Sequence, residues 1–240
     1  MPRGAIVIPA RYQSSRFPGK PLADILGRSM IQHVYDKCCQ AIDPSQVYVA
    51  TDSHQIKSVV ESFNGKVIMT SPDCLTGTDR LAEASDYLNH EFLINVQGDE
   101  PMIDPASISL AYDYMANDSS RVLNCYSKIE SNEIDMATVP KVVISESGRL
   151  LYMSRGGCPF DKEGSPKARF KQVCIYGFNR DHLLTFRERS AKTTNEVIED
   201  IEILRFLDLD VSVQMLEVSG GTIAVDTPED LERVRACLSV

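Results

Sequence analysis

The chain has 240 residues, of which 43% are hydrophobic and 25% are charged, which are the values of an ordinary globular protein and exclude a disordered or low-complexity chain. Its formal net charge of −9 disfavours general nucleic-acid binding. No apolar run approaches the ~20 residues that span a bilayer, so we expect neither nucleic acid nor a membrane as a partner.

The cysteines indicate a reducing compartment. There are seven, an odd number, with no CxxC pair and no Cys or His pair at the spacing of zinc ligands. The first apolar run is too short for a signal segment and is expected to be a strand. We therefore expect free thiols, no zinc and a cytoplasmic protein.

Strands and helices alternate along the first half of the chain. Apolar runs with the length and composition of strands occur at 5–9, 47–50, 67–69 and 92–96. Between them, helical spacing of apolar residues is found at 28–41 and 79–90. This alternation predicts an α/β fold with a mostly parallel sheet covered on both faces, and such sheets bind ligands beyond the carboxyl ends of their strands.

The second half has a different pattern. Apolar runs with shorter spacers predict an antiparallel extension, with strands at 139–145, 150–154 and 172–178 and a hairpin turn at Ser147 and Gly148. Residues 156–170 are rich in Gly and Pro and predict a long excursion that serves as a lid or a subunit contact. A helix is expected over 195–207, and a last helix is expected to begin at Thr227 and Pro228.

A basic loop directly follows the first strand. Residues 1–40 carry six basic and two acidic side chains, whereas residues 196–235 carry three basic and eleven acidic ones. The loop holds Arg11, Arg16 and Lys20, and such guanidinium and ammonium groups suit a polyphosphate. The spacing is neither GxxxxGK[ST] nor GxGxxG, so a solvated basic loop is the alternative.

Two aspartates follow apolar runs at widely separated positions. Asp99 lies in the segment Gly98-Asp99-Glu100, where the glycine would allow close backbone approach, and Asp226 is expected to end another strand just before the last helix. Each alone is compatible with a turn or a helix cap. Together they predict a two-carboxylate Mg²⁺ site, because Mg²⁺ commonly uses one or two carboxylates with phosphate oxygens.

A hydroxyl-rich segment follows the third apolar run. Ser71 and the stretch 76–80, which ends in Arg80, would place hydroxyls and backbone groups near a base and an arginine near a phosphate. This signal is weak when taken alone.

Taken together, these segments resemble the 3-deoxy-manno-octulosonate (Kdo) cytidylyltransferases, the CMP-Kdo synthetases of bacterial lipopolysaccharide assembly. The stretches that carry the resemblance run in family order over nearly the whole chain: IPARYQSSRFPGKPL, MIQHVY, VATD, MTS, GTDRLAE, NVQGDEP, SRGGCPF, IYGF and VDTPEDLERVR. The joint match is specific, although no single segment is.

The resemblance implies a Rossmann-like nucleotide-diphospho-sugar transferase fold, with a mixed, mostly parallel sheet and an antiparallel dimerisation excursion. One domain would span 1–240, with a CTP-binding half at about 1–125, a sugar-binding and dimerisation portion at about 126–220, and the metal-binding strand end and last helix at 221–240. CTP, a sugar acid, Mg²⁺ and a second copy of the chain would be its partners.

The resemblance also implies roles for individual residues. The nucleotide would be bound by Ala10, Arg11, Ser14, Lys20, Ser71 and Arg80. The catalytic set would be Arg11, Lys20, Asp99 and Asp226, and the two aspartates would hold Mg²⁺. The sugar acid would be contacted by Gln97, Arg155, Gln172, Tyr176, Glu196 and Glu199.

Three departures from the family pattern fall in the sugar half. Gln172 stands where the family has a histidine, and the segments 155–159 and 194–196 also differ. An acidic wall of Glu196, Glu199 and Glu202 would suit an ammonium, so 8-amino-3,8-dideoxy-manno-octulosonate (8-amino-Kdo) and Kdo are both candidate sugars. Activation of another acidic sugar, such as a sialic acid, and a non-catalytic nucleotide-binding module are the alternative functions.

Overall fold

The computed structural model describes residues 3–13, 17–220 and 222–239. Within these residues, nine strands form one sheet: β1 (Gly4–Ala10), β4 (Val47–Thr51), β5 (Lys66–Met69), β6 (Phe92–Val96), β7 (Val122–Lys128), β8 (Lys141–Ile144), β9 (Leu150–Ser154), β10 (Phe170–Asn179) and β11 (Val213–Glu217). A separate two-stranded hairpin consists of β2 (Asp24–Ile25) and β3 (Arg28–Ser29).

The strands are connected by helices, as the alternating pattern predicts. The α-helices are α1 (Met30–Ala41), α2 (His54–Ser62), α3 (Gly77–Ala84), α4 (Pro105–Asn117), α5 (Arg180–Glu188), α6 (Thr194–Glu199), α7 (Leu204–Asp208) and α8 (Pro228–Leu238). Short 3₁₀ turns are η1 (Lys20–Leu22), η2 (Pro44–Gln46), η3 (Ser85–Tyr87) and η4 (Ser131–Glu133).

The sheet has the strand order β11-β7-β10-β6-β1-β4-β5. Strand β1 runs parallel to both β4 and β6, and β4 runs parallel to β5. Strand β10 is antiparallel to β6 and β7, and β8 and β9 form an antiparallel hairpin attached to β10. The mixed, mostly parallel sheet and its antiparallel extension are therefore confirmed.

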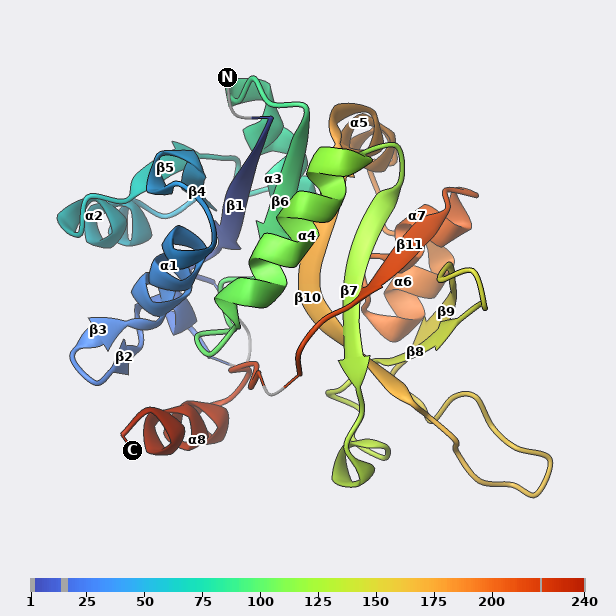
Figure 1. The fold of residues 1–240 in the computed structure, drawn as a ribbon. Coiled ribbons are helices and arrows are strands. Elements are labelled where there is room, and N and C mark those ends of the chain that lie inside the picture. The colour runs from blue at the N-terminus through green and yellow to red at the C-terminus, as the bar shows by residue number, and fades with distance from the viewer. Residues whose placement is uncertain (1–2, 14–16, 221, 240) are drawn as a thin grey trace.

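Both faces of the sheet are covered. All seven residues of β1 are buried, as expected for a central parallel strand. Ile6 and Ile8 pack into one core with residues of α1 and α4, whereas Ala5 and Val7 pack into a second core with residues of α3 and α5. Figure 1 shows α4 lying across one face of the sheet. The candidate site lies at the edge of the sheet where the carboxyl ends of β1 and β6 emerge.

Two expectations for the acidic C-terminal part need correction. The single helix predicted over 195–207 is two helices, α6 and α7, because Asp200 adopts a left-handed conformation with φ +49° that ends α6. Residues 222–226, expected as a strand that ends at Asp226, form no strand. They are held instead by single contacts, such as Val225 N–H donating to the carbonyl of Asp99 at 2.9 Å.

Other local predictions are confirmed. The turn between β8 and β9 contains Gly148 at φ +80°, a conformation that glycine adopts without strain. Helix α8 begins at Pro228 after Thr227, whose hydroxyl accepts a hydrogen bond from Asp230 N–H. The excursion 156–170 extends away from the sheet (Figure 1), with Phe160 62% exposed at an isolated bridge.

The structure bears on two compositional expectations. Each of the seven cysteines is a free thiol. In the described part of the chain, every helix is too short or too polar to cross a bilayer.

Helix α4 offers a stability prediction. Asp104 caps this helix by accepting hydrogen bonds from the N–H groups of Ala106 and Ser107, and the Ser219 hydroxyl also donates to its carboxylate. These hydrogen bonds, first that of Ser219, hold the pKa of Asp104 below its usual range. Asp104→Ala should lower the free energy of unfolding by about 1 kcal/mol at pH 7.

The pH dependence of this effect has a definite sign. Because the folded-state pKa is lowered, the contribution is complete above the ordinary aspartate pKa and is lost as the pH falls through the folded-state value. Urea unfolding of both proteins should give a constant difference from pH 7 to pH 5 and a narrowing one in stronger acid. A difference that grows on acidification would contradict this role of Asp104.

Candidate active site

A polar cleft of about 610 Å³ lies at the carboxyl ends of β1 and β6. This is the edge at which a parallel sheet is expected to bind ligands. Of the residues predicted to act on nucleotide, metal or sugar, eight line the cleft: Ala10, Arg11, Lys20, Arg80, Gln97, Asp99, Arg155 and Asp226.

Glycines allow the walls of this cleft to approach closely. A β-carbon on Gly98 would lie 3.0 Å from the carbonyl oxygen of Pro9, so the backbone after β6 passes directly beside the end of β1. A β-carbon on Gly77, at the start of α3, would lie 2.9 Å from the amide nitrogen of Gln97. The absence of side chains at these two positions therefore brings β1, β6 and α3 together.

Two aspartates from distant parts of the chain converge on one lysine. Lys20 Nζ lies 2.8 Å from Asp99 Oδ2 and 3.3 Å from Asp226 Oδ1. The Lys20 side chain is 15% exposed and each aspartate is 29% exposed. The hydrogen bond from Val225 N–H to the Asp99 carbonyl fixes the two acidic segments side by side. The cleft thus contains two carboxylates that face a single cationic point.

The charge of Lys20 is stabilised by this arrangement. Burial alone would lower the pKa of its ammonium, but the charges and hydrogen bonds of Asp99 and Asp226 outweigh burial and raise the pKa. Lys20 therefore remains a cation at neutral pH, although it is mostly shielded from solvent.

Local backbone geometry places Lys20 at the cleft. Gly19 has φ +72°, and its N–H donates to the carbonyl of Tyr12 at 2.9 Å, which closes the loop that follows β1. Lys20 then begins the 3₁₀ turn η1. Arg11 is exposed and lines the same cleft. The predicted nucleotide contact Ser14 lies outside the described residues.

Arg80 is a buried residue that lines the cleft. Its side chain is 3% exposed, and its guanidinium lies 3.4 Å from a carboxylate oxygen of Asp52 and donates to the Thr70 hydroxyl. The same guanidinium donates to the carbonyl of Ser71 at 3.4 Å. Ser71 itself is outside the cleft lining and contributes by holding Arg80.

Gln97 is oriented by a buried acid. Its side-chain amide donates to Glu202 Oε1 at 3.0 Å, and the other oxygen of Glu202 accepts from Thr78 N–H at 2.8 Å. Burial raises the pKa of the Glu202 carboxyl, and the hydrogen bond from Thr78 is the largest opposing cause. The amide of Gln97 is thereby fixed at the cleft wall.

Arg155 also lines the cleft and is held by backbone carbonyls. Its guanidinium donates to the carbonyls of Glu199 at 2.6 Å, Asp200 at 3.0 Å and Ala137 at 3.0 Å. The Glu199 carboxylate accepts from Arg155 N–H at 2.9 Å and from the Ser154 hydroxyl at 2.7 Å. Glu199 therefore supports Arg155 and does not line the cleft itself.

Three other predicted sugar contacts also lie outside the cleft. Glu196 is fully buried and forms an ion pair with Arg205, so it cannot present a carboxylate to a ligand. Tyr176 is 3% exposed, and Gln172 donates its amide to the Tyr176 hydroxyl and to Asn124, each at 3.1 Å. In this structure, Gln172 and Tyr176 belong to a polar cluster on β10 and β7.

The residues that line the cleft without an individually predicted role include Cys74, Leu75, Ala137, Thr138 and Asp200. Ala137 and Thr138 belong to a connection before β8 and carry no motif. Asp200 carries a weak signal, because aspartate tolerates the left-handed conformation that ends a helix.

The donor set of the cleft limits what it can hold. Among the described residues, no three His, Cys, Asp or Glu side chains gather as a complete metal site. The carboxylates of Asp99 and Asp226 remain as a pair of hard oxygen donors directed at one point. Such a pair suits a cation that takes its other ligands from phosphate and water.

The family model and the related sequences all describe cytidylyltransferases. The family model described as cytidylyltransferase matches residues 5–215. The 3-deoxy-manno-octulosonate cytidylyltransferase of Myxococcus xanthus is 41% identical, covering 98% of this chain and 96% of that protein. The enzymes of the same name from Escherichia coli and Geobacter metallireducens are 38% and 42% identical, and each comparison covers at least 96% of both proteins.

Solved structures agree with the sequence relatives. The structure of CMP:2-keto-3-deoxy-manno-octonic acid synthetase complexed with CTP matches with a TM-score of 0.91 and 38% identity, covering 99% of this chain and 98% of the other. A cytidylyltransferase from Leptospira borgpetersenii, at 16% identity and a TM-score of 0.65, shares the fold. The resemblance found in the sequence is confirmed: the chain is a nucleotidyltransferase and belongs to the 3-deoxy-manno-octulosonate cytidylyltransferase family.

Proposed function

We propose that this enzyme transfers CMP from CTP to the sugar acid Kdo, giving CMP-Kdo and pyrophosphate for lipopolysaccharide assembly. The observation that carries the proposal is the convergence of Asp99, Asp226 and Lys20 in the cleft beyond β1 and β6. The relatives named for this activity and the similar structure that holds CTP support it.

In the proposed reaction, the anomeric hydroxyl oxygen of the sugar acid bonds to the α-phosphorus of CTP. The bond from that phosphorus to the oxygen that bridges to the β-phosphate breaks, and pyrophosphate leaves with the electron pair. The hydroxyl proton passes to solvent. The chain supplies positioning and neutralisation of charge, and no nucleophile of its own is required.

Charge repulsion is the main obstacle to this reaction. Like unit charges at ~4 Å repel by about 4 kcal/mol at an effective dielectric constant near 20. Lys20 and Arg11 line the side of the cleft proposed for the triphosphate. Arg155 and the Gln97 amide line the side proposed for the sugar carboxylate and hydroxyls. The sugar acid and the triphosphate would thus approach each other between two cationic walls.

Mg²⁺ fits the carboxylate pair. Asp99 and Asp226 already stabilise one cation, the Lys20 ammonium, at the point where they converge, and carboxylate oxygens are the donors that Mg²⁺ prefers. When bound, Mg²⁺ would offset phosphate charge and lower the pKa of a hydroxyl group bound to it.

We also propose a cytoplasmic homodimer formed through the excursion 156–170, whose Phe160 is exposed.

The identity of the sugar is the finer part of the proposal. The acids expected to form a wall for the ammonium of 8-amino-Kdo are engaged elsewhere in this structure, because Glu196 pairs with Arg205, Glu199 supports Arg155 and Glu202 holds Gln97. Asp200 is the acidic residue of this region that lines the cleft, and its carboxylate forms an ion pair with Lys192 at 2.8 Å. We therefore place Kdo first and keep the amino sugar as the alternative.

The direct test is an assay of the purified enzyme with CTP and Mg²⁺ and one sugar acid at a time. Kdo, 8-amino-Kdo and a sialic acid would be compared by pyrophosphate release, and each CMP-sugar would be identified by mass spectrometry. We expect kcat/KM for Kdo to exceed that for the other acids by about tenfold or more, the range that one altered contact supplies. Preference for 8-amino-Kdo would reassign the sugar. CTP binding without release of pyrophosphate from CTP in the presence of any of these acids would contradict the activity.

A further inference from the structure

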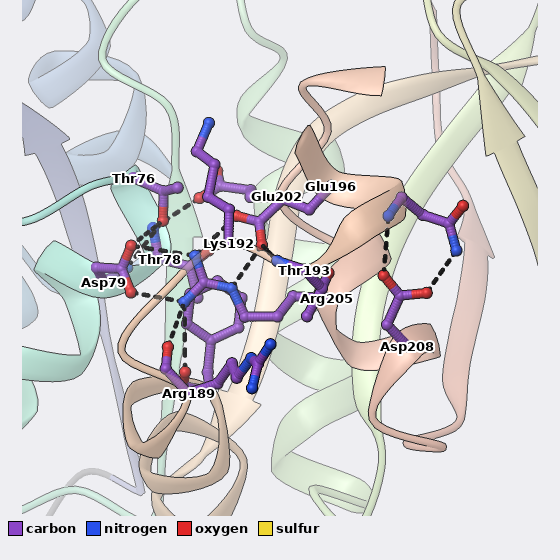
Figure 2. Close-up of polar contacts among 12 residues, drawn as sticks. Thr76, Thr78, Asp79, Arg189, Lys192, Thr193, Glu196, Glu202, Arg205 and Asp208 are labelled. Atoms are coloured by element: carbon purple, nitrogen blue, oxygen red, sulfur yellow. Dashed lines mark hydrogen bonds and ion pairs between the residues drawn. The ribbon is translucent and has the colours of Figure 1, made fainter. Parts of the chain in front are cut away.

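A buried ion-pair cluster joins two walls of the cleft without lining the cleft itself. At its centre is Arg205 of α7, whose side chain is 0% exposed. Figure 2 shows its guanidinium between Asp79 of α3 and Glu196 of α6. Because two carboxylates face one guanidinium here, the geometry has to be well satisfied for such a buried cluster to persist.

The guanidinium forms a two-sided fork. Towards α6, Nε and one terminal nitrogen donate to the two oxygens of Glu196, each at 2.7 Å. Towards α3, the two terminal nitrogens donate to the two oxygens of Asp79 at 2.8 and 3.3 Å. The guanidinium also lies 3.7 Å from the ring centroid of Phe186. A lysine could not reproduce this arrangement, since it has no planar fork.

The Asp79 side of the fork leads to the start of α3. Thr76, which caps this helix, donates its hydroxyl to Asp79 at 2.8 Å and accepts from Asp79 N–H at 3.1 Å. Thr76 and Arg80 line the cleft on the wall proposed for the nucleotide, and Gly77 lies between this wall and the Gln97 amide. The position of Asp79 therefore determines where this wall begins.

The Glu196 side of the fork leads to Arg155. Glu196 closes the capping box of α6 by accepting from Thr193 N–H at 3.1 Å. Three residues later, Glu199 and Asp200 hold Arg155 through the hydrogen bonds described above. The position of α6 therefore determines where Arg155 stands on the wall proposed for the sugar acid.

We infer that Arg205 is a positioning residue that sets the nucleotide wall through Asp79 and the sugar wall through Glu196. This inference rests on the proposed function, because it assigns each side of the fork to one of the two substrates. Arg205 touches neither substrate. Through these two contacts it holds each wall in the position where that wall binds its own substrate.

The test weakens the contacts of Arg205 with Asp79 and with Glu196 separately, using substitutions that preserve side-chain shape. Asp79→Asn should raise KM for CTP by about tenfold, which corresponds to about 1.4 kcal/mol of lost binding, and should raise KM for the sugar acid by no more than about threefold. Glu196→Gln should do the reverse. In both variants, kcat at saturation should stay within about threefold of the wild-type value. Arg205→Lys should raise both KM values.

The matched control is Asp86→Asn, which makes the same chemical change in an exposed ion pair with Arg187 between η3 and α5. Its KM values should equal those of the wild type. Thermal unfolding and near-UV circular dichroism would show that each variant is folded, and CTP affinity would be measured by calorimetry without turnover.

The outcomes are distinct. If the wild-type enzyme fails to bind CTP, the proposed function fails. If the wild type is active but both variants raise both KM values equally, or lower only thermal stability, a merely structural ion pair is shown and the inference is overturned. Opposite selectivity of Asp79→Asn and Glu196→Gln supports it.

Discussion

Asp99→Asn is expected to lower kcat by at least about a hundredfold, the cost of removing one preorganised electrostatic group at a reacting centre. Asp99 is one of the two carboxylates that face Lys20, and the amide keeps its size but loses its charge. Mg²⁺ would then have one charged ligand from the protein instead of two. Activity would be measured as pyrophosphate release at saturating CTP, sugar acid and Mg²⁺.

The variant should remain folded, because the Asp99 side chain is 29% exposed and its backbone contact with Val225 is unchanged. Asp36→Asn is a suitable control, since Asp36 pairs with Arg28 on the surface and lies outside the cleft. Full activity of Asp99→Asn, or loss of its folded circular dichroism spectrum, would count against the role proposed for this carboxylate.

Lys20→Ala is expected to reduce kcat/KM for CTP by about a hundredfold, because a charge-assisted contact to phosphate in a shielded cleft is lost. KM for the sugar acid should change little. The raised pKa of Lys20 implies that the wild-type ammonium persists through neutral and mildly alkaline pH, so this contribution should fade only at strongly alkaline pH. A selective loss of sugar affinity would reassign the basic loop.

The same variant also tests the convergence of the two aspartates without turnover. When Lys20 is absent, Asp99 and Asp226 face each other without their shared cation, and the metal-free protein should unfold at a lower temperature. Mg²⁺ should then raise the unfolding temperature of Lys20→Ala more than that of the wild type, because the ion relieves the repulsion. An equal or smaller Mg²⁺ effect in the variant would contradict the proposed metal site.

Much of the fold and of the cleft could be predicted because strand ends in a parallel sheet have a fixed relation to one another. The apolar runs that became β1 and β6 are continuous, so the residues that follow them had to emerge at one edge. Asp226 lies at this edge for a different reason from the predicted one, since the segment before it forms no strand. The hydrogen bond from Val225 N–H to the carbonyl of Asp99 helps to hold it beside Asp99, and no pattern in the sequence indicates this contact.

The acidic segment shows where prediction from sequence stops. The acidic residues within 196–202 are chemically similar, but the fold gives them different surroundings. Glu196 is buried against Arg205, Glu199 accepts a hydrogen bond from Arg155 N–H, and Asp200 lines the cleft. Helix α6 ends at Asp200, whose carbonyl accepts a hydrogen bond from the Arg155 guanidinium, so these acidic side chains are distinguished by tertiary contacts. Charge alone could not separate a wall for a ligand from an internal ion pair.

The central claim is that Asp99 and Asp226 form one cation site for the triphosphate of CTP. The most direct measurement is a crystal structure of the enzyme with Mn²⁺ and a CTP analogue that cannot be cleaved at the α-phosphorus, with the ion located by anomalous scattering. The account predicts a peak within about 2.2 Å of an oxygen of each aspartate and of a phosphate. A peak bound to phosphates alone, or the two carboxylates separated with no ion between them, would contradict it.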